Sequence, residues 1–200
     1  FSSSNFIFFL LWSQGQIKTM GGFGGIVTSM IIAPDNNTLI TACKDNTIRF
    51  FNISDGSLIK TLEGHLLSVT SLAISKNGKT LFSGSSDKTI KIWDLNTWSC
   101  IKTINGHKNL VTSIALSPDE KTLVSGSGDK TIKLWSLPEG KCIKTMSKHT
   151  DWVTSIAITS DGKTLISGSR DKTVRLWSLK GHLIKTLEGH SDWVTSVAIS

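Results

Sequence analysis

Short apolar runs alternate with turn-forming residues throughout the chain. In the stretch that begins at Val69, four β-prone runs are separated by turns that contain Gly, Asn, Asp or Ser. Asn77-Gly78 and Asp161-Gly162 favour hairpin turns, because glycine tolerates a positive φ. No segment keeps a helical period for ten residues. The pattern predicts a unit of four strands, at residues 69–75, 80–85, 89–94 and 100–104.

This unit repeats along the chain. The tripeptide Val-Thr-Ser begins at positions 27, 69, 111, 153 and 194, so its copies are evenly spaced apart from a slightly shorter last interval. A period of about 40 to 45 residues is typical of four-stranded propeller blades and not of helical repeats. We expect one propeller domain over residues 1–200, with repeat units at about 23–64, 65–106, 107–148 and 149–189, a partial unit at 190–200 and a degenerate partial blade at 1–22.

The size and polarity of the residues predict the position of each strand within a blade. The first two strands carry small residues, which suits strands packed on both faces near a crowded axis: Ser71, Ala73, Ser83 and Gly84. The fourth strand carries Lys102 and Thr103, as expected of an outer edge strand.

The repeated motifs resemble those of the WD-repeat (β-transducin) family. Gly64-His65 is followed by SGSSDKTIKIWDL from Ser83, and Gly106-His107 is followed by SGSGDKTIKLWSL. Only Trp93-Asp94 is a true Trp-Asp pair. The resemblance covers residues 13–200, and the near-identical units are similar to the long arrays of bacterial multidomain WD proteins. It implies an all-β propeller with four complete four-stranded antiparallel blades and partial blades at both ends.

The resemblance also implies a buried hydrogen-bonded set in each blade, formed by a His, a Ser, an Asp and a Trp. An indole N–H only donates, a hydroxyl accepts and donates onward, and a neutral imidazole can accept from the hydroxyl and donate to a carboxylate. The expected sets are His65, Ser83, Asp87 and Trp93; His107, Ser125, Asp129 and Trp135; and His149, Ser167, Asp171 and Trp177.

His, Ser and Asp together also suggest a catalytic triad, but an enzyme needs one exposed and uniquely activated nucleophile, whereas this set recurs in three units. There is no HExxH motif or Cys/His cluster for a metal. Gly78-Lys79-Thr80 lacks the earlier glycine of a phosphate-binding loop, since Ala73 stands there. We therefore expect no catalytic residues, cofactor, metal or small-molecule substrate.

The unit at 23–64 departs from the pattern, as Phe23, Thr41 and Phe51 replace the His, Ser and Trp. Asp45 keeps its place but loses two partners. We expect this blade to depend more on apolar packing. Residues 1–12, aligned through Trp12, are interpreted as degenerate second and third strands.

Charge and composition add little to this interpretation. The net charge is +7, but the lysines recur at fixed phases and are spread around the molecule, so we expect solvated strand positions and no nucleic-acid site. Residues 6–12 are too short an apolar run to span a bilayer and lack the features of a signal peptide. The cysteines, Cys43, Cys100 and Cys142, are interpreted as small buried residues in a reducing, cytoplasmic compartment.

The candidate partner-binding face lies where the copies differ. The residue before each Val-Thr-Ser and the residue before each turn Asp vary between units. Trp and Arg side chains tend to dominate binding energy, so Trp152, Trp193 and Arg170 are the candidate anchors, with Leu110 and Lys44 on the same face. The alternative is that each Trp only covers the end of a blade. Trp98 lies on the opposite rim and receives little weight.

Two interpretations of the chain ends remain open: a fragment of a longer propeller, or a five-bladed ring closed by a strand at 194–199. The expected function is a non-catalytic scaffold that binds other proteins or peptides. The alternative is a sensor or targeting propeller of a larger kinase or NTPase signalling protein whose catalytic domain lies outside this segment.

Overall fold

The computed structural model describes residues 9–13, 16–20 and 25–199, and every regular element in these ranges is a β-strand. Four sheets of four strands each are termed blades 1 to 4. Blade 1 contains β3 (Val27–Ile32), β4 (Thr38–Cys43), β5 (Ile48–Asn52) and β6 (Leu58–Leu62). Blade 2 contains β7 (Val69–Ile74), β8 (Thr80–Ser85), β9 (Ile90–Asp94) and β10 (Ser99–Ile104). Blade 3 contains β11 (Val111–Leu116), β12 (Thr122–Ser127), β13 (Ile132–Ser136) and β14 (Lys141–Met146). Blade 4 contains β15 (Val153–Ile158), β16 (Thr164–Ser169), β17 (Val174–Ser178) and β18 (Leu183–Leu187).

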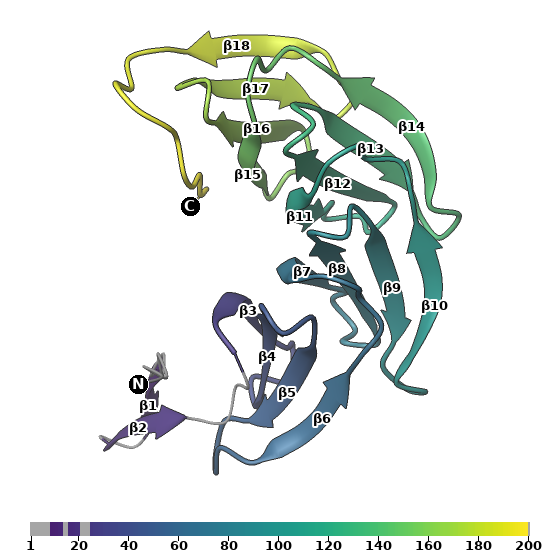
Figure 1. Cartoon of the computed structure of the whole chain (residues 1–200), viewed down its shortest axis with the longest axis vertical. Coiled ribbons are helices and arrows are strands. Elements are labelled where there is room, and N and C mark those ends of the chain that lie inside the picture. The colour runs from purple at the N-terminus through teal and green to yellow at the C-terminus, as the bar shows by residue number, and fades with distance from the viewer. Residues whose placement is uncertain (1–8, 14–15, 21–24, 200) are drawn as a thin grey trace.

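Each blade is an antiparallel meander in which consecutive strands are neighbours. The first strands lie on the inner side of an arc and the fourth strands on its outer side (Figure 1). The fourth strands are exposed over most of their length, in agreement with the predicted outer edge. The predicted all-β, blade-forming architecture is thus confirmed, and the strand limits in blade 2 differ from the predicted ones by at most one residue.

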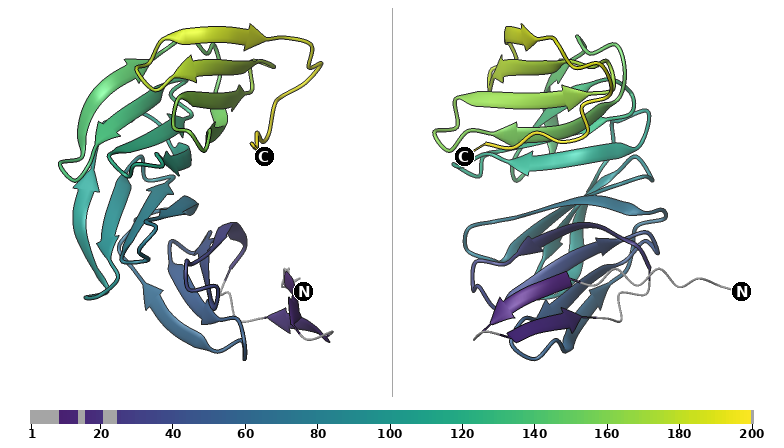
Figure 2. Two further views of the ribbon diagram at one scale, coloured as in Figure 1. Left: turned by 180° about the vertical axis from the view of Figure 1, so that it is seen from behind. Right: turned by 90° about the vertical axis from the view of Figure 1, so that its left-hand side faces the viewer.

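The hydrophobic core lies between the blades. One cluster joins Phe82 and Ile92 of blade 2 to Val111, Ile114 and Trp135 of blade 3, and equivalent clusters lie at the other two blade junctions. Successive sheets therefore stack along the arc, as the rotated views in Figure 2 show. Each blade depends on its neighbour to bury its apolar residues.

The Val-Thr-Ser tripeptide forms the junction between blades. In blade 2 the register shifts between Val69 and Ser71, and the hydroxyl of Thr70 donates to the carbonyl of Val111 in blade 3 at 2.6 Å. The hydroxyl of Ser71 accepts the backbone N–H of Ile114 at 3.0 Å. The same two contacts recur between blades 3 and 4. These bonds explain why the tripeptide repeats.

Residues before blade 1 form a separate two-stranded antiparallel sheet, β1 (Phe9–Ser13) and β2 (Gln16–Met20), in whose backbone register Trp12 is paired with Ile17. Their sequence places them as the third and fourth strands of a blade. The expected second strand falls at residues 1–8, outside the described residues.

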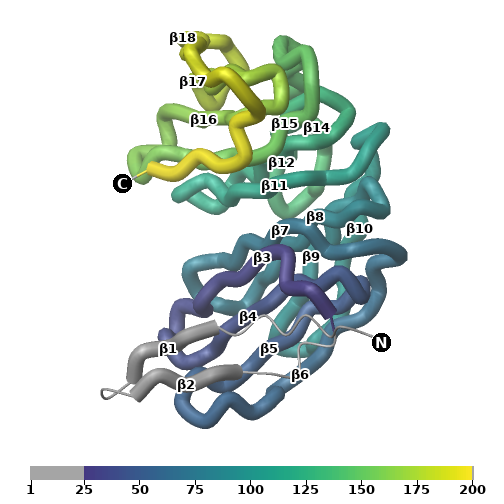
Figure 3. Tube along the Cα trace, turned by 60° about the vertical axis from the view of Figure 1, so that its left-hand side comes forward, coloured from purple at the N-terminus to yellow at the C-terminus, as the bar shows by residue number. Residues whose placement is uncertain are grey.

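The C-terminal segment follows blade 4 without forming a strand. Residues 190–199 leave β18 and run back along the inner side of blade 4, as the tube in Figure 3 shows. Thr154 donates to the carbonyl of Val194, and the hydroxyl of Ser155 accepts the N–H of Val197 at 3.2 Å. The segment thus occupies the place of a first strand of a further blade.

The four sheets form an open arc, and residues 194–199 do not pair with β1 or β2. The alternative in which a strand at 194–199 closes a five-bladed ring is therefore not seen in the described residues. A strand needs a hydrogen-bonded partner, and this segment has only side-chain and single backbone contacts with blade 4.

The cysteines also differ from the prediction. Cys43 is buried, but Cys100 and Cys142 are exposed. Both lie near the start of a fourth strand, where the outer edge of the blade meets solvent.

Candidate functional site

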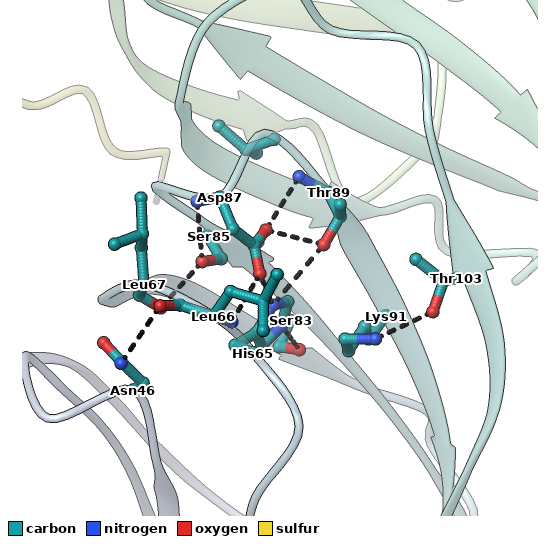
Figure 4. Close-up of polar contacts among 12 residues, drawn as sticks. Asn46, His65, Leu66, Leu67, Ser83, Ser85, Asp87, Thr89, Lys91 and Thr103 are labelled. Atoms are coloured by element: carbon teal, nitrogen blue, oxygen red, sulfur yellow. Dashed lines mark hydrogen bonds and ion pairs between the residues drawn. The ribbon is translucent and has the colours of Figure 1, made fainter.

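The four polar side chains predicted for blade 2 form one continuous chain of hydrogen bonds, most of which Figure 4 shows. The indole N–H of Trp93 donates to the Ser83 hydroxyl at 2.8 Å, and this hydroxyl lies 2.7 Å from Nε2 of His65. Nδ1 of His65 lies 2.8 Å from the Asp87 carboxylate. This order requires a neutral imidazole with its proton on Nδ1, which accepts from Ser83 and donates to Asp87.

The same geometry recurs in the next two blades. In both, the Trp–Ser distance is 2.8 Å and the Ser–His distance is 2.7 Å, and the His–Asp distance is 2.8 Å in blade 3 and 2.7 Å in blade 4. Each Asp also caps its own turn. Asp87 accepts the hydroxyl of Thr89 at 2.6 Å and the backbone N–H of Leu66 at 3.0 Å. The set therefore ties the loop before the blade to the second and third strands and to the turn between them.

Burial shifts the pKa values of these groups. Burial is the largest influence on His65 and His149 and lowers the pKa of both, despite their Asp partners, because it disfavours the imidazolium. Burial acts to raise the pKa of Asp87, but hydrogen bonds from Thr89, His65 and the backbone outweigh it and lower the pKa to about 2. The carboxylates stay charged and the two imidazoles stay neutral near pH 7.

The order of contacts from Ser through His to Asp is also that of a catalytic triad, but the position of the serine is different. Ser83, Ser125 and Ser167 are fully buried and already receive a hydrogen bond from an indole. A buried serine cannot meet a substrate, so the set acts as a structural tie in all three blades.

Blade 1 replaces this set by a different one. Thr41 is buried and Phe51 fills the place of the Trp. Asp45 is held by the guanidinium of Arg49 at 2.7 Å and by the hydroxyl of Thr47 at 2.7 Å. The residue at the His position, Phe23, lies outside the described residues. The sequence analysis did not anticipate Arg49 as a partner of Asp45. The signal was that blade 1 has arginine at this position of the third strand, where blades 2 and 3 have Lys91 and Lys133.

The variable positions come together at one end of the blades, here termed the loop face. It consists of the loops before the first strands and the turns between the second and third strands. In every blade the residue before the turn Asp donates its N–H to the carbonyl of the residue before Val-Thr-Ser. The four pairs are Lys44 with Ile26, Ser86 with Ser68, Gly128 with Leu110, and Arg170 with Trp152.

Three of the candidate anchors form a single cluster on this face. The guanidinium carbon of Arg170 lies 4.0 Å from the ring centroid of Trp152 and 4.3 Å from that of Trp193. Trp193 is 53% exposed, whereas Trp152 is half-buried. The indole of Trp152 packs close to Gly128 of blade 3, since a Cβ on this glycine would lie 3.3 Å from Cδ2 of the indole. Two indoles from successive repeats thus flank one cation.

The loops that carry the indoles are held locally. Asp151 accepts the N–H of Trp152 and Asp192 accepts the N–H of Trp193, each at 2.7 Å. Leu110 of blade 3 holds the position that Trp152 has in blade 4, and Lys44 of blade 1 holds the position of Arg170. Lys44 is therefore distant along the arc from the cluster, whereas Leu110 precedes Trp152 by one blade.

The sequence interpretation did not anticipate the packing of Trp98 between two blades. Trp98 lies in the turn between β9 and β10, and its ring packs edge-on against Phe50 of blade 1 at a centroid distance of 4.9 Å. The signal was in the sequence, since the other complete blades have glycine at this position: Gly56, Gly140 and Gly181.

Two findings restrict the chemistry of the described residues. No helix among them has the length and apolarity needed to cross a membrane. Within the same residues, no group of three or more His, Cys, Asp or Glu side chains is arranged to hold a metal ion.

Comparison with known proteins identifies the repeat. The family model described as "WD domain, G-beta repeat" matches residues 14–52, 56–94, 98–136, 140–178 and 181–200. The matches 56–94, 98–136 and 140–178 each combine the fourth strand of one blade with the first three strands of the next, so the sequence unit is offset from the blade by one strand. A search of curated proteins found no significant match. Matches of this extent show that the chain belongs to the WD-repeat family, whose repeats generally mediate protein–protein interaction without catalysis.

Proposed function

We propose that this protein is a non-catalytic scaffold that binds other proteins or peptides through its loop face. The observation that carries the proposal is the cluster in which Arg170 lies between the indoles of Trp152 and Trp193. Family membership supports the general role, and the cluster supports the choice of the loop face as the binding surface.

The chemistry of the cluster suits recognition of a protein surface. Tryptophan and arginine are the side chains most enriched among residues that dominate binding energy. The exposed Trp193 offers apolar contact area, and the Arg170 guanidinium has five N–H donors for carboxylate or carbonyl acceptors. Contact with two aromatic rings holds the cation in place before a partner arrives, which lowers the entropy lost on binding.

The repeated frame supports the same role. The Ser–His–Asp–Trp sets hold the loops of blades 2 to 4 in one geometry, while the side chains at the variable positions differ from blade to blade. A constant frame with varied side chains on one face is typical of a binding platform. The free cysteines, two of them exposed, support a reducing, cytoplasmic location.

Selection of binding peptides tests this proposal. A displayed random peptide library is selected against the wild-type chain, and the peptides obtained are measured by calorimetry against the variant Arg170→Ala/Trp193→Ala. The same peptides are measured against wild type and against Ile184→Ala, a control that removes a similarly exposed apolar side chain from the outer strand β18. We expect the loop-face variant to bind at least tenfold more weakly and the control to bind like wild type. Selected peptides that bind both variants equally would place the interaction elsewhere.

A further inference from the structure

Trp98 occupies a backbone position that the repeat otherwise gives to glycine. The turns between the third and fourth strands have positive φ at Gly56, Gly140 and Gly181, with values of 79°, 66° and 83°. Trp98 has a φ of 55° at the same position. A bulky residue is rare in this region of backbone space, because its Cβ approaches the backbone closely. Its presence requires compensation elsewhere.

The compensation is the contact of the indole with blade 1. Trp98 packs against the hydrophobic cluster shared by blades 1 and 2 and meets Phe50 edge-on. A cavity of about 230 Å³ remains beside it, lined by Ile40, Phe50, Ile59, Ile74 and Leu95. Trp98 therefore fills much of the space between the two blades, at the end opposite to the loop face.

The next blade junction has the same walls without the indole. One repeat later the equivalent wall residues are Phe82, Ile92, Ile101, Leu116 and Leu137, and Gly140 stands in place of Trp98. The cavity there measures about 610 Å³. Ligand pockets commonly fall between about 300 and 1,000 Å³ and are mainly apolar with a few polar groups.

Polar groups hold the mouth of this larger cavity in shape. The ammonium of Lys102 donates to the carbonyls of Pro138 and Glu139, at 3.2 and 2.8 Å. The carboxylate of Glu120 accepts the backbone N–H of Lys76. These contacts link blade 2 to blade 3 across the cavity, and the two glutamates supply acceptors at its rim.

We propose that the cavity between blades 2 and 3 is a second binding site, which takes an aromatic side chain of indole size from a partner protein. The molecule itself shows the occupant, because the equivalent walls between blades 1 and 2 enclose the indole of Trp98. The rim carboxylates of Glu120 and Glu139 suit an occupant that carries an N–H donor, as indole does. This site lies at the opposite end of the blades from Arg170 and does not rest on the function proposed for the loop face.

A reciprocal exchange of the two turn residues tests the proposal. The probes are 5-fluoroindole and N-acetyl-tryptophanamide, and binding is followed by the ¹⁹F signal of the first and by chemical shifts of the isoleucine and leucine methyl groups. We expect one saturable site in the wild-type chain at about millimolar concentration, the range usual for so small a ligand. Gly140→Trp should weaken binding at least tenfold, and Trp98→Gly should add a second site.

Each arm of the experiment has a defined meaning. Equal binding to wild type and a folded Gly140→Trp variant would overturn the proposal, and so would the absence of saturable binding to wild type. If Gly140→Trp does not fold, shifts confined to the methyl groups of Ile92, Ile101 and Leu116 in the wild-type chain support the site, and shifts elsewhere overturn it. Binding of fluoroindole without N-acetyl-tryptophanamide would contradict a peptide-borne occupant and indicate a small-molecule site. The loop-face variant Arg170→Ala/Trp193→Ala should bind both probes like wild type.

Discussion

The Ser–His–Asp–Trp set shows how a buried polar group is tolerated only when every donor and acceptor is used. The indole N–H, the hydroxyl, both imidazole nitrogens and the carboxylate are each satisfied within one chain of contacts. Among the described residues, no buried side-chain nitrogen or oxygen lacks a partner. Removing one member therefore leaves a neighbour unsatisfied in a dry environment, which is costly.

Trp135→Phe should destabilise the chain by about 1–3 kcal/mol, because Ser125 and His107 lose the only indole donor of their set. Phe51 shows that the fold accepts a phenyl ring at this position in blade 1. Urea unfolding followed by circular dichroism measures the effect. Trp193→Phe, on the exposed loop face, is the matched control and should leave the unfolding midpoint unchanged. Equal midpoints for Trp135→Phe and wild type would show that the set contributes little.

The stability of the chain should fall as the pH decreases, in two stages. His65 and His149 have pKa values below 6.5 in the folded state, so below pH 6.5 the unfolded state takes up protons first and is favoured. Asp87 has a folded pKa of about 2 against 3.8, so its contribution is present above pH 3.8 and is lost as the pH falls towards 2.

Thermal unfolding between pH 7.5 and 2 measures this dependence. A His149→Gln variant should show a weaker dependence on pH between 7 and 5, whereas His182→Gln, at an exposed position, should keep the wild-type slope. An unfolding temperature that is constant between pH 7 and 5 would mean that the buried imidazoles gain protons as easily as free ones.

The residues of the buried Ser–His–Asp–Trp sets could be predicted from the sequence, because donor and acceptor chemistry together with the family resemblance assigns a partner to each side chain. The Arg170 cluster could be anticipated only as three separate residues. Trp152 and Trp193 belong to successive repeats, and their separation in space depends on how far one repeat is rotated from the next. The exposure of Cys100 and Cys142 was misjudged, because the outer strand that carries each of them is exposed on both sides over most of its length.

Strands and turns were predictable because turn chemistry marks their ends. Asn, Asp and Gly at the turns limited each strand of blade 2 to within one residue. The register shift beside each Val-Thr-Ser was not predictable from the alternation of polar and apolar residues. At this shift the hydroxyl of Thr70 contacts the carbonyls of Gly84 in its own blade and of Val111 in the next one.

In blades 2 to 4 the close approach of the next segment leaves little room for a side chain at the glycine of the second strand. A Cβ on Gly126 would lie 2.7 Å from Cγ1 of Val153 and 3.0 Å from Cδ1 of Ile156. Gly126→Ala should therefore destabilise the chain by about 1–3 kcal/mol through overpacking.

A double-mutant cycle with Val153→Ala tests this contact by urea unfolding. Removing the Val153 methyl groups makes room for the new Cβ, so the double variant should be more stable than the sum of the single changes predicts. Strict additivity would show that the clash is relieved by a shift of the backbone and that the glycine serves another purpose.

The four blades form an open arc, and the first blade leaves apolar side chains uncovered. Met30 and Ile32 on β3 are 41% and 53% exposed, whereas their counterparts in blade 3, Ile114 and Leu116, are buried or half-buried between blades. Exposed apolar surface of this kind promotes association. We expect the chain to self-associate as its concentration rises.

Size-exclusion chromatography with light scattering measures this association. Met30→Lys/Ile32→Thr should shift the population towards monomer, whereas Leu58→Lys/Ile59→Thr, on the outer strand of the same blade, should shift it less. A monomeric wild-type chain at all concentrations would mean that this face is covered in solution.

The overall architecture could be inferred from the regular period of the repeat, but whether the first and last blades meet to close a ring could not. A repeat length determines the blade, whereas ring closure depends on the rotation between blades and on strand pairing between distant segments. Residues 194–199 match a first strand in sequence and in their contacts with Thr154 and Ser155, yet they are paired with no strand in a sheet among the described residues.

The central claim is that partners bind at the loop face around Arg170. The most direct measurement is ¹⁹F NMR of the chain labelled with 5-fluorotryptophan, titrated with a peptide selected for binding, with resonances assigned by single Trp→Phe variants. The account predicts that the signals of Trp152 and Trp193 shift on binding while those of the buried Trp93, Trp135 and Trp177 stay in place. A saturable titration that leaves Trp152 and Trp193 unchanged would contradict it.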